Sequence, residues 1–171
     1  MCAASLDATA RRKAYEIDSA AIWLLRNMRN GWEEVAHVRL SLFGPGAKFH
    51  HVGLVIQDAS AAGIKDLERI TDPIQRVCVG FVSLEDCCVE LIEPLGVDSP
   101  VMNSLRKGMK YLHLCFEVED LGEALKLARY HGFKIIHDPT PATAFAGREI
   151  AWLWHEVWGV IELLASDAVM P

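Results

Sequence analysis

Two short stretches of the chain decide the fold: residues 51–56 read HVGLVI and residues 113–118 read HLCFEV. Both begin with a histidine and continue with mostly apolar residues, which is typical of a buried strand. A second matching pair lies further along, VELI at residues 89–92 and IELL at residues 161–164. Each half of the chain therefore begins on a strand with a His and ends on a strand with a Glu. This pattern indicates an internal repeat.

The elements between these stretches support the repeat. The second half predicts a strand, a helix and three further strands. The helix, over residues 121–131, begins at a capping-box pattern of Asp120 and Glu123 and ends at Gly132. The first half predicts the same order with a shorter, less regular helix. Its segment 60–70 contains Gly63 and leaves little room for a full amphipathic helix.

The first 47 residues differ from the rest and predict a helical extension. Its apolar residues fall at the spacing of one helix face, namely Ile17, Ala21, Leu24, Leu25 and Met28. Gly31 is a natural end for this helix, and residues 43–46 read as a turn or linker. We expect the extension to pack on its own domain or on a partner subunit.

Composition bounds the class of protein. The chain has 171 residues, of which 51% are hydrophobic, and a net charge of −6. These values exclude a disordered chain, and the lack of a basic block beyond residues 11–13 argues against nucleic acid. The longest apolar stretches are too short to span a membrane, and no signal peptide is readable. Five cysteines without a C-x-x-C pair indicate reduced thiols. We therefore predict a cytoplasmic protein with no membrane or nucleic-acid partner.

The matched His and Glu residues carry the chemistry. Because side chains alternate along a strand, Tyr111, His113, Cys115 and Glu117 are predicted to share one face, opposite Leu112 and Leu114. By the same rule, His50 should point away from His51.

Glu90 and Glu162 are each flanked by apolar residues, and an unpaired buried carboxylate is costly. Two His and two Glu can compensate one another through a divalent ion, and the donor set suits Co, Zn, Ni, Mn or Fe(II). We therefore predict metal ligation by His51, Glu90, His113 and Glu162.

Four motifs resemble the vicinal-oxygen-chelate (glyoxalase/bleomycin-resistance/dioxygenase) superfamily, and within it the methylmalonyl-CoA epimerases. They are VELIEPLGVDSP at 89–100, HLCFEVEDL at 113–121, GREIAWL at 147–153 and GVIEL at 159–163. The resemblance implies an α+β fold of paired βαβββ modules, which form a curved mixed sheet around a metal and substrate cavity. Module 1 would span about residues 48–96 and module 2 about residues 109–166 of a 48–166 domain, with the helical extension before it.

The resemblance also implies a function and residue roles. It suggests an epimerase or isomerase that moves the α-proton of an acyl thioester such as methylmalonyl-CoA through a metal-stabilised enolate. It carries metal ligation onto the four residues named above and makes Glu162 a proton carrier as well. Gln75 and Arg148 are weaker candidates for substrate binding, and the likeness makes a homodimer plausible.

The likeness departs at one point. Similar proteins have a second proton-carrying carboxylate near the second strand of the first module, where this chain reads TDPIQRV at residues 71–77. Gln75 cannot act as a base, and Asp72 is expected in the turn. Two other functions therefore stay open: a glyoxalase I-like lyase or related metal-dependent enzyme acting on a different substrate, and a metal-free small-molecule-binding module.

Overall fold

The computed structural model describes residues 41–60, 63–64 and 66–167. The predicted helix of the N-terminal extension lies outside this part of the chain. The described elements, in chain order, are β1 Lys48–Val55, β2 Ile70–Asp72, β3 Val77–Leu84, β4 Cys87–Pro94, α2 Met102–Arg106, β5 Tyr111–Val118, α3 Leu121–Tyr130, β6 Lys134–Pro141, the 3₁₀ turn η4 Thr143–Phe145, β7 Glu149–His155 and β8 Gly159–Ala165.

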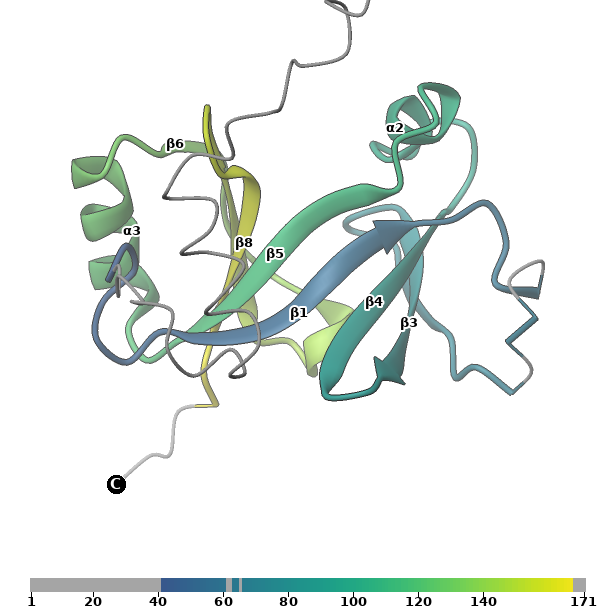
Figure 1. Cartoon of the computed structure of the whole chain (residues 1–171), viewed down its shortest axis with the longest axis horizontal. Helices are drawn as coiled ribbons and strands as arrows, with labels where there is room; N and C mark the ends of the chain where they lie inside the picture. Colours follow the sequence, from purple (N-terminus) through teal and green to yellow (C-terminus); the bar gives the residue numbers. More distant parts are fainter. Residues whose placement is uncertain (1–40, 61–62, 65, 168–171) are drawn as a thin grey trace, which may run out of the picture. The chain divides into compact units, whose positions relative to one another are not determined.

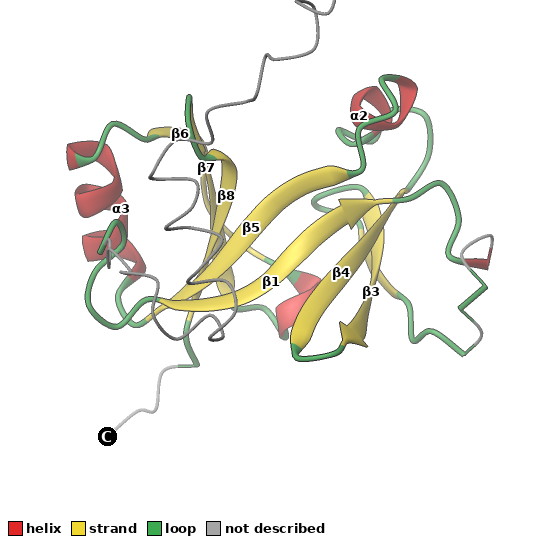
Figure 2. Cartoon of the chain, in the orientation of Figure 1, coloured by secondary structure: helices red, strands yellow, loops and turns green. Residues whose placement is uncertain are grey.

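The eight strands of the described residues form one mixed sheet, and Figures 1 and 2 show that this sheet is curled. The strand order of the sheet is β2-β3-β4-β1-β5-β8-β7-β6. Each module forms one half of the sheet, and the two halves meet at the antiparallel pair β1–β5. In each half the first strand runs parallel to the last, β1 with β4 and β5 with β8. The predicted repeat and the α+β fold are confirmed.

The register of the sheet repeats as well. Gly53 on β1 is paired with Glu90 on β4, and Cys115 on β5 is paired with Glu162 on β8. In both halves, therefore, the glutamate lies across from the residue two positions after the histidine. Because β1 and β5 are neighbours, this common register brings both histidines and both glutamates to the centre of the sheet.

Two β-bulges interrupt the central β1–β5 pair. Phe49 pairs with Phe116 and His51 with Cys115, so that His50 is left as an extra residue on β1. Gly53 pairs with His113 and Leu54 with Tyr111, so that Leu112 is the extra residue on β5. A bulge bends its strand and breaks the alternation of side chains. The prediction that Leu112 shares a face with Leu114 is therefore wrong, because the two side chains pack in different hydrophobic clusters.

The two modules have cores of unequal size. Helix α3 has the predicted Asp120 cap, whose side chain accepts a hydrogen bond from the Glu123 amide. Its buried residues pack with β5, β7 and β8 in a cluster that includes Leu121, Ala124, Leu125, Ala128, Val118, Leu153, Ile161 and Leu163. The first module has a smaller cluster around Val55, Val79 and Ile92. The described residues between β1 and β2 contain no α-helix.

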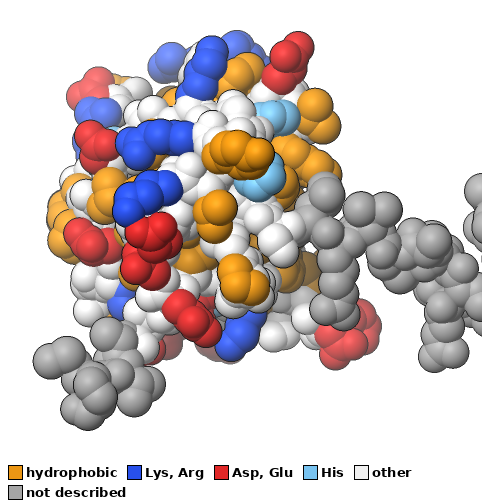
Figure 3. Space-filling view, turned by 90° about the vertical axis from the view of Figure 1, so that its left-hand side faces the viewer, with side chains coloured by type: hydrophobic (Ala, Val, Ile, Leu, Met, Phe, Trp, Pro, Cys, Tyr) orange, Lys and Arg blue, Asp and Glu red, His pale blue; other side chains and the backbone are white. Residues whose placement is uncertain are grey.

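The surface seen in Figure 3 carries acidic and basic side chains side by side, among scattered hydrophobic ones, as a solvated surface does. Within the described residues, every helix is too short or too polar to cross a bilayer. The cytoplasmic location stays a prediction.

Candidate metal centre and cavity

Four side chains converge on one point between the two modules. His51 on β1 and His113 on β5 bring their Nε2 atoms to 3.1 Å of each other. The Glu162 Oε2 atom on β8 lies 3.2 Å from both nitrogens. The Glu90 Oε2 atom on β4 lies 3.4 Å from His51 Nε2 and 3.5 Å from His113 Nε2. All four side chains are buried. The structure thus brings together the four residues that the sequence selected as ligands.

The spacing of these atoms fits a shared divalent ion. Nitrogen and carboxylate oxygen bind zinc at about 2.0–2.2 Å, so that ligand atoms around one ion lie roughly 3–3.5 Å apart, as these atoms do. Among the described residues, the buried Glu162 Oε2 atom makes close contacts with the two imidazoles but no hydrogen bond of regular geometry, which is costly for a carboxylate oxygen. A cation among these atoms would compensate it. The residues therefore fit the predicted ion, and ligation itself stays a prediction.

Without a cation, the four groups stabilise one another electrostatically. Burial on its own would lower the pKa of His51, but its contacts with the carboxylates of Glu162 and Glu90 raise that pKa to about 9. Burial would raise the pKa of Glu162, yet the close approach of His113 and His51 holds that pKa well below its usual range. At neutral pH the metal-free site therefore contains a protonated His51 beside an ionised Glu162. A metal ion has to displace the proton.

Packing holds the His113 ring. Gly53 lies opposite His113 across the β1–β5 pair, and a Cβ atom at Gly53 would lie 2.1 Å from His113 Cε1. The Trp152 ring stands nearly perpendicular to the imidazole, with the two centroids 4.8 Å apart. His113 Nδ1 has no hydrogen-bond partner among the described residues. The absence of a side chain at position 53 therefore makes the room that this imidazole occupies.

A cavity of about 430 Å³ adjoins the four side chains, and Glu90 and Glu162 form part of its wall. Most of the remaining wall is apolar and includes Val77, Val79, Ile92, Val101, Leu112, Phe145 and Val160. An apolar cavity with a few convergent polar groups is the usual form of a small-molecule site.

Gln75, one of the two predicted substrate-binding residues, lies in this wall. Its Oε1 atom accepts a hydrogen bond of 3.2 Å from Trp152 Nε1. With the oxygen engaged by Trp152, the amide NH₂ group is the donor that Gln75 can offer to a bound molecule. The same Trp152 packs against His113, so that Gln75 and the imidazole are held by one shared neighbour.

Arg148, the other predicted substrate-binding residue, lies elsewhere. Its Nη1 atom is 2.8 Å from Glu117 Oε2 and its Nε atom is 3.6 Å from Asp167 Oδ1. Its guanidinium group lies over the Phe145 ring. Arg148 is not among the described residues that line the cavity. A role in substrate binding stays a prediction, and these contacts give it a structural role in joining β5, η4 and the segment after β8.

Asp72 also lines the cavity, but its carboxylate is occupied. One oxygen accepts from the amides of Ile74 and Gln75, and the other accepts from the amide of Thr143, all at 2.9 Å. Asp72 therefore fixes the turn that presents Gln75 and ties it to η4 of the second module. The Asp72-Pro73 pair signals a turn in the sequence, whereas the bond to Thr143 has no local signal.

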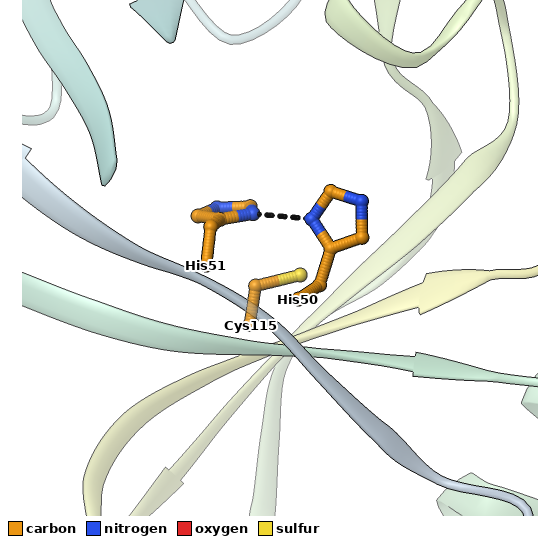
Figure 4. Close-up of side chains that lie close together, drawn as sticks. All are labelled: His50, His51 and Cys115. Carbon is orange, nitrogen blue, oxygen red and sulfur yellow. Dashed lines mark hydrogen bonds between the residues drawn. The ribbon is translucent and has the colours of Figure 1, made fainter. Parts of the chain in front are cut away.

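The structure corrects the position of His50. Strict alternation placed it on the opposite face from His51, and the bulge instead brings the Nδ1 atoms of the two rings to 2.8 Å of each other (Figure 4). Cys115 lies beside the pair. The repeat could not reveal this contact, because the residue at the equivalent place before His113 is Leu112.

Comparison with known proteins identifies the class. Residues 50–152 match the family described as the Glyoxalase/Bleomycin resistance protein/Dioxygenase superfamily. The chain belongs to this family, and the resemblance drawn from its motifs is confirmed.

Within the family, the chain is similar to methylmalonyl-CoA epimerases. It is 34% identical to the mitochondrial enzyme of Dictyostelium discoideum over 90 residues, which cover 49% of this chain and 54% of that protein. The match therefore spans about half the length of this relative. It is 26% identical to the ethylmalonyl-CoA/methylmalonyl-CoA epimerase of Cereibacter sphaeroides over 116 residues, 62% of this chain and 87% of that protein.

A solved structure shares the fold. A Streptomyces coelicolor methylmalonyl-CoA epimerase variant, in complex with 2-nitronate-propionyl-CoA, superposes with a TM-score of 0.59 at 24% identity. The superposition covers 71% of this chain and 96% of that one. At this sequence identity the superposition shows a shared fold and no more than that.

Proposed function

We propose that this chain is a metal-dependent epimerase that moves the α-proton of an acyl thioester such as methylmalonyl-CoA. The observation that carries the proposal is the convergence of two buried His and two buried Glu side chains beside a largely apolar cavity. The similarity to methylmalonyl-CoA epimerases supports the choice of substrate.

His51, Glu90, His113 and Glu162 would hold a divalent ion of the Co, Zn, Ni, Mn or Fe class. When bound, the ion supplies a Lewis acid that stabilises the negative charge developing on the substrate oxygens as the enolate forms. The apolar wall limits water around that charge and strengthens every electrostatic contact in the cavity. The Gln75 amide donates a hydrogen bond to a substrate oxygen.

Epimerisation needs two proton carriers, one for each face of the α-carbon. The C–H bond breaks as Glu162 takes the proton, and a second group returns a proton to the opposite face. Among the described residues that line the cavity, three have carboxyl groups, namely Asp72, Glu90 and Glu162. Because the carboxylate of Asp72 is occupied by three backbone amides, we assign the second transfer to Glu90. The reaction is balanced, since one proton leaves and one returns.

Hydrogen exchange in deuterated water tests this assignment. The metal-loaded protein is incubated with each epimer of methylmalonyl-CoA separately, and the loss of the α-hydrogen is followed together with the appearance of the other epimer. We expect the wild type to place deuterium at the α-carbon of the product from either side. Glu162→Gln and Glu90→Gln keep an oxygen for the ion and should slow epimerisation by about 10²–10⁴-fold. Each should still exchange the α-hydrogen of one epimer.

Glu119→Gln, at an exposed position after β5, is the matched control and should behave as the wild type. Full metal occupancy without any α-hydrogen exchange would contradict the choice of substrate. Turnover of a hemithioacetal by that same protein would instead support the glyoxalase-like alternative. Ligand binding by a chain that takes up no metal would support the metal-free binding module.

A further inference from the structure

The surroundings of His50 and His51 determine which of the two imidazoles donates the hydrogen bond between them and which accepts it. His51 Nε2 faces Glu162, Glu90 and His113. Its Nδ1 atom is 2.8 Å from His50 Nδ1, a distance that requires one proton between the two nitrogens (Figure 4). If Nε2 is to offer a lone pair to an ion, the His51 proton must sit on Nδ1. His50 Nδ1 is then the acceptor.

We propose that His50 is a positioning residue for the candidate metal centre: by accepting a hydrogen bond from His51 Nδ1, it fixes the tautomer and the ring orientation that point His51 Nε2 at the ion. This inference rests on the proposed function, because it assumes that an ion binds there. Metal-bound imidazoles generally donate their second N–H to a partner, and these partners strengthen metal binding.

His50 is itself held in place. It is the bulge residue of β1 and is only partly buried. Its ring packs edge-to-face with the buried Phe145 ring, with centroids 5.6 Å apart and planes at 87°. Phe145 also stacks on His51 at 5.8 Å and 24°. One aromatic side chain from η4 thus packs against both imidazoles.

The same cluster is not arranged as a second metal site. Cys115 lies near both rings, but burial raises the pKa of its thiol far above the usual value, which disfavours the thiolate that metals bind. His51 would also have to bind ions through both of its nitrogens. A hydrogen bond accounts for the 2.8 Å contact without either demand.

The test uses His50→Leu, which removes the acceptor, and His50→Asn, whose Oδ1 atom stands near the place of Nδ1 and retains one. His131→Leu, at an exposed position after α3, is the matched control. The first readout is nitrogen NMR of the full chain, which reports the proton on His51 Nδ1 and a scalar coupling across the N–H···N bond. The second is the affinity for Zn²⁺ and the visible absorption spectrum of the Co²⁺-loaded protein.

We expect the coupling between His50 and His51 in the wild type, with His51 as donor. His50→Leu should lose about 10–100-fold in Zn²⁺ affinity and change the Co²⁺ spectrum, and His50→Asn should restore most of both. Any of three results would overturn the proposal. These are a His51 Nδ1 atom without a proton, the binding of two ions per chain, and an unchanged Zn²⁺ affinity and Co²⁺ spectrum in His50→Leu. If the wild type binds no metal, that result defeats the proposed function, and the N–H···N coupling in the metal-free chain still decides whether His50 accepts from His51.

Discussion

Both modules have a β-bulge before the site histidine, but the bulge residue differs between them. In each, a bulge places one extra residue directly before the site histidine, His50 before His51 and Leu112 before His113. The polar residue gives His51 a hydrogen-bond partner, whereas the apolar residue leaves His113 Nδ1 without one among the described residues. One imidazole is thus oriented by a hydrogen bond and the other by packing. The repeat places the four site residues equivalently in the two modules, while the contacts that orient the two imidazoles differ.

The modules also differ in what supports them. The second module packs helix α3 against its strands, and the first has no α-helix among its described residues. The four site residues nevertheless occupy equivalent places, because strand register fixes them. Stability and ligand geometry should therefore be separable by mutation.

The largest effect is expected from Gly53→Ala. Its methyl group would lie 2.1 Å from His113 Cε1, so that the imidazole has to leave its place. Losing a whole ligand should weaken metal binding by more than the 10–100-fold that is typical of a lost supporting contact. Titration with Zn²⁺ measures the change, and Cys115→Ala, which only shortens the side chain at the equivalent place in β5, is its control. Equal affinity in Gly53→Ala and the wild type would break the argument that packing orients His113.

A large effect on stability alone is expected from Leu125→Ala in α3. This substitution empties part of the larger core and should lower the free energy of unfolding by about 2–5 kcal/mol. Val79→Ala, in the smaller cluster, should cost less. Denaturant unfolding measures both. Metal affinity should stay unchanged in each folded variant, and a parallel loss of affinity in Leu125→Ala would show that the helix supports the site after all.

The smallest effect concerns pH in the metal-free protein. The pKa of His51 is raised in the folded chain, so its protonation stabilises the fold fully below the unfolded value of about 6.5. That contribution is lost as the pH rises through about 9. The melting temperature should therefore fall between these values, and it should fall less in Glu162→Gln, which lacks the partner charge. A flat profile for the wild type would contradict the ion pairing within the four residues.

The repeat and the four site residues could be predicted because both rest on patterns that a sequence displays, namely matched strands and charged residues in apolar surroundings. The β-bulges could not be predicted, because an extra residue within a strand does not change the type of residues found there. Strict alternation therefore puts His50 and Leu112 on the wrong faces. The bonds of Trp152 to Gln75 and of Asp72 to Thr143 join the two modules, and contacts at such sequence distance leave no local signal.

We propose that residues from both modules hold one divalent ion between them. Elemental analysis of the purified full chain, after incubation with Zn²⁺ and removal of excess metal, tests it most directly. We expect about one equivalent of zinc per chain in the wild type and in His131→Leu, and the loss of this zinc in His113→Ala. Metal retained at one equivalent in His113→Ala, or no metal in the wild type, would contradict it.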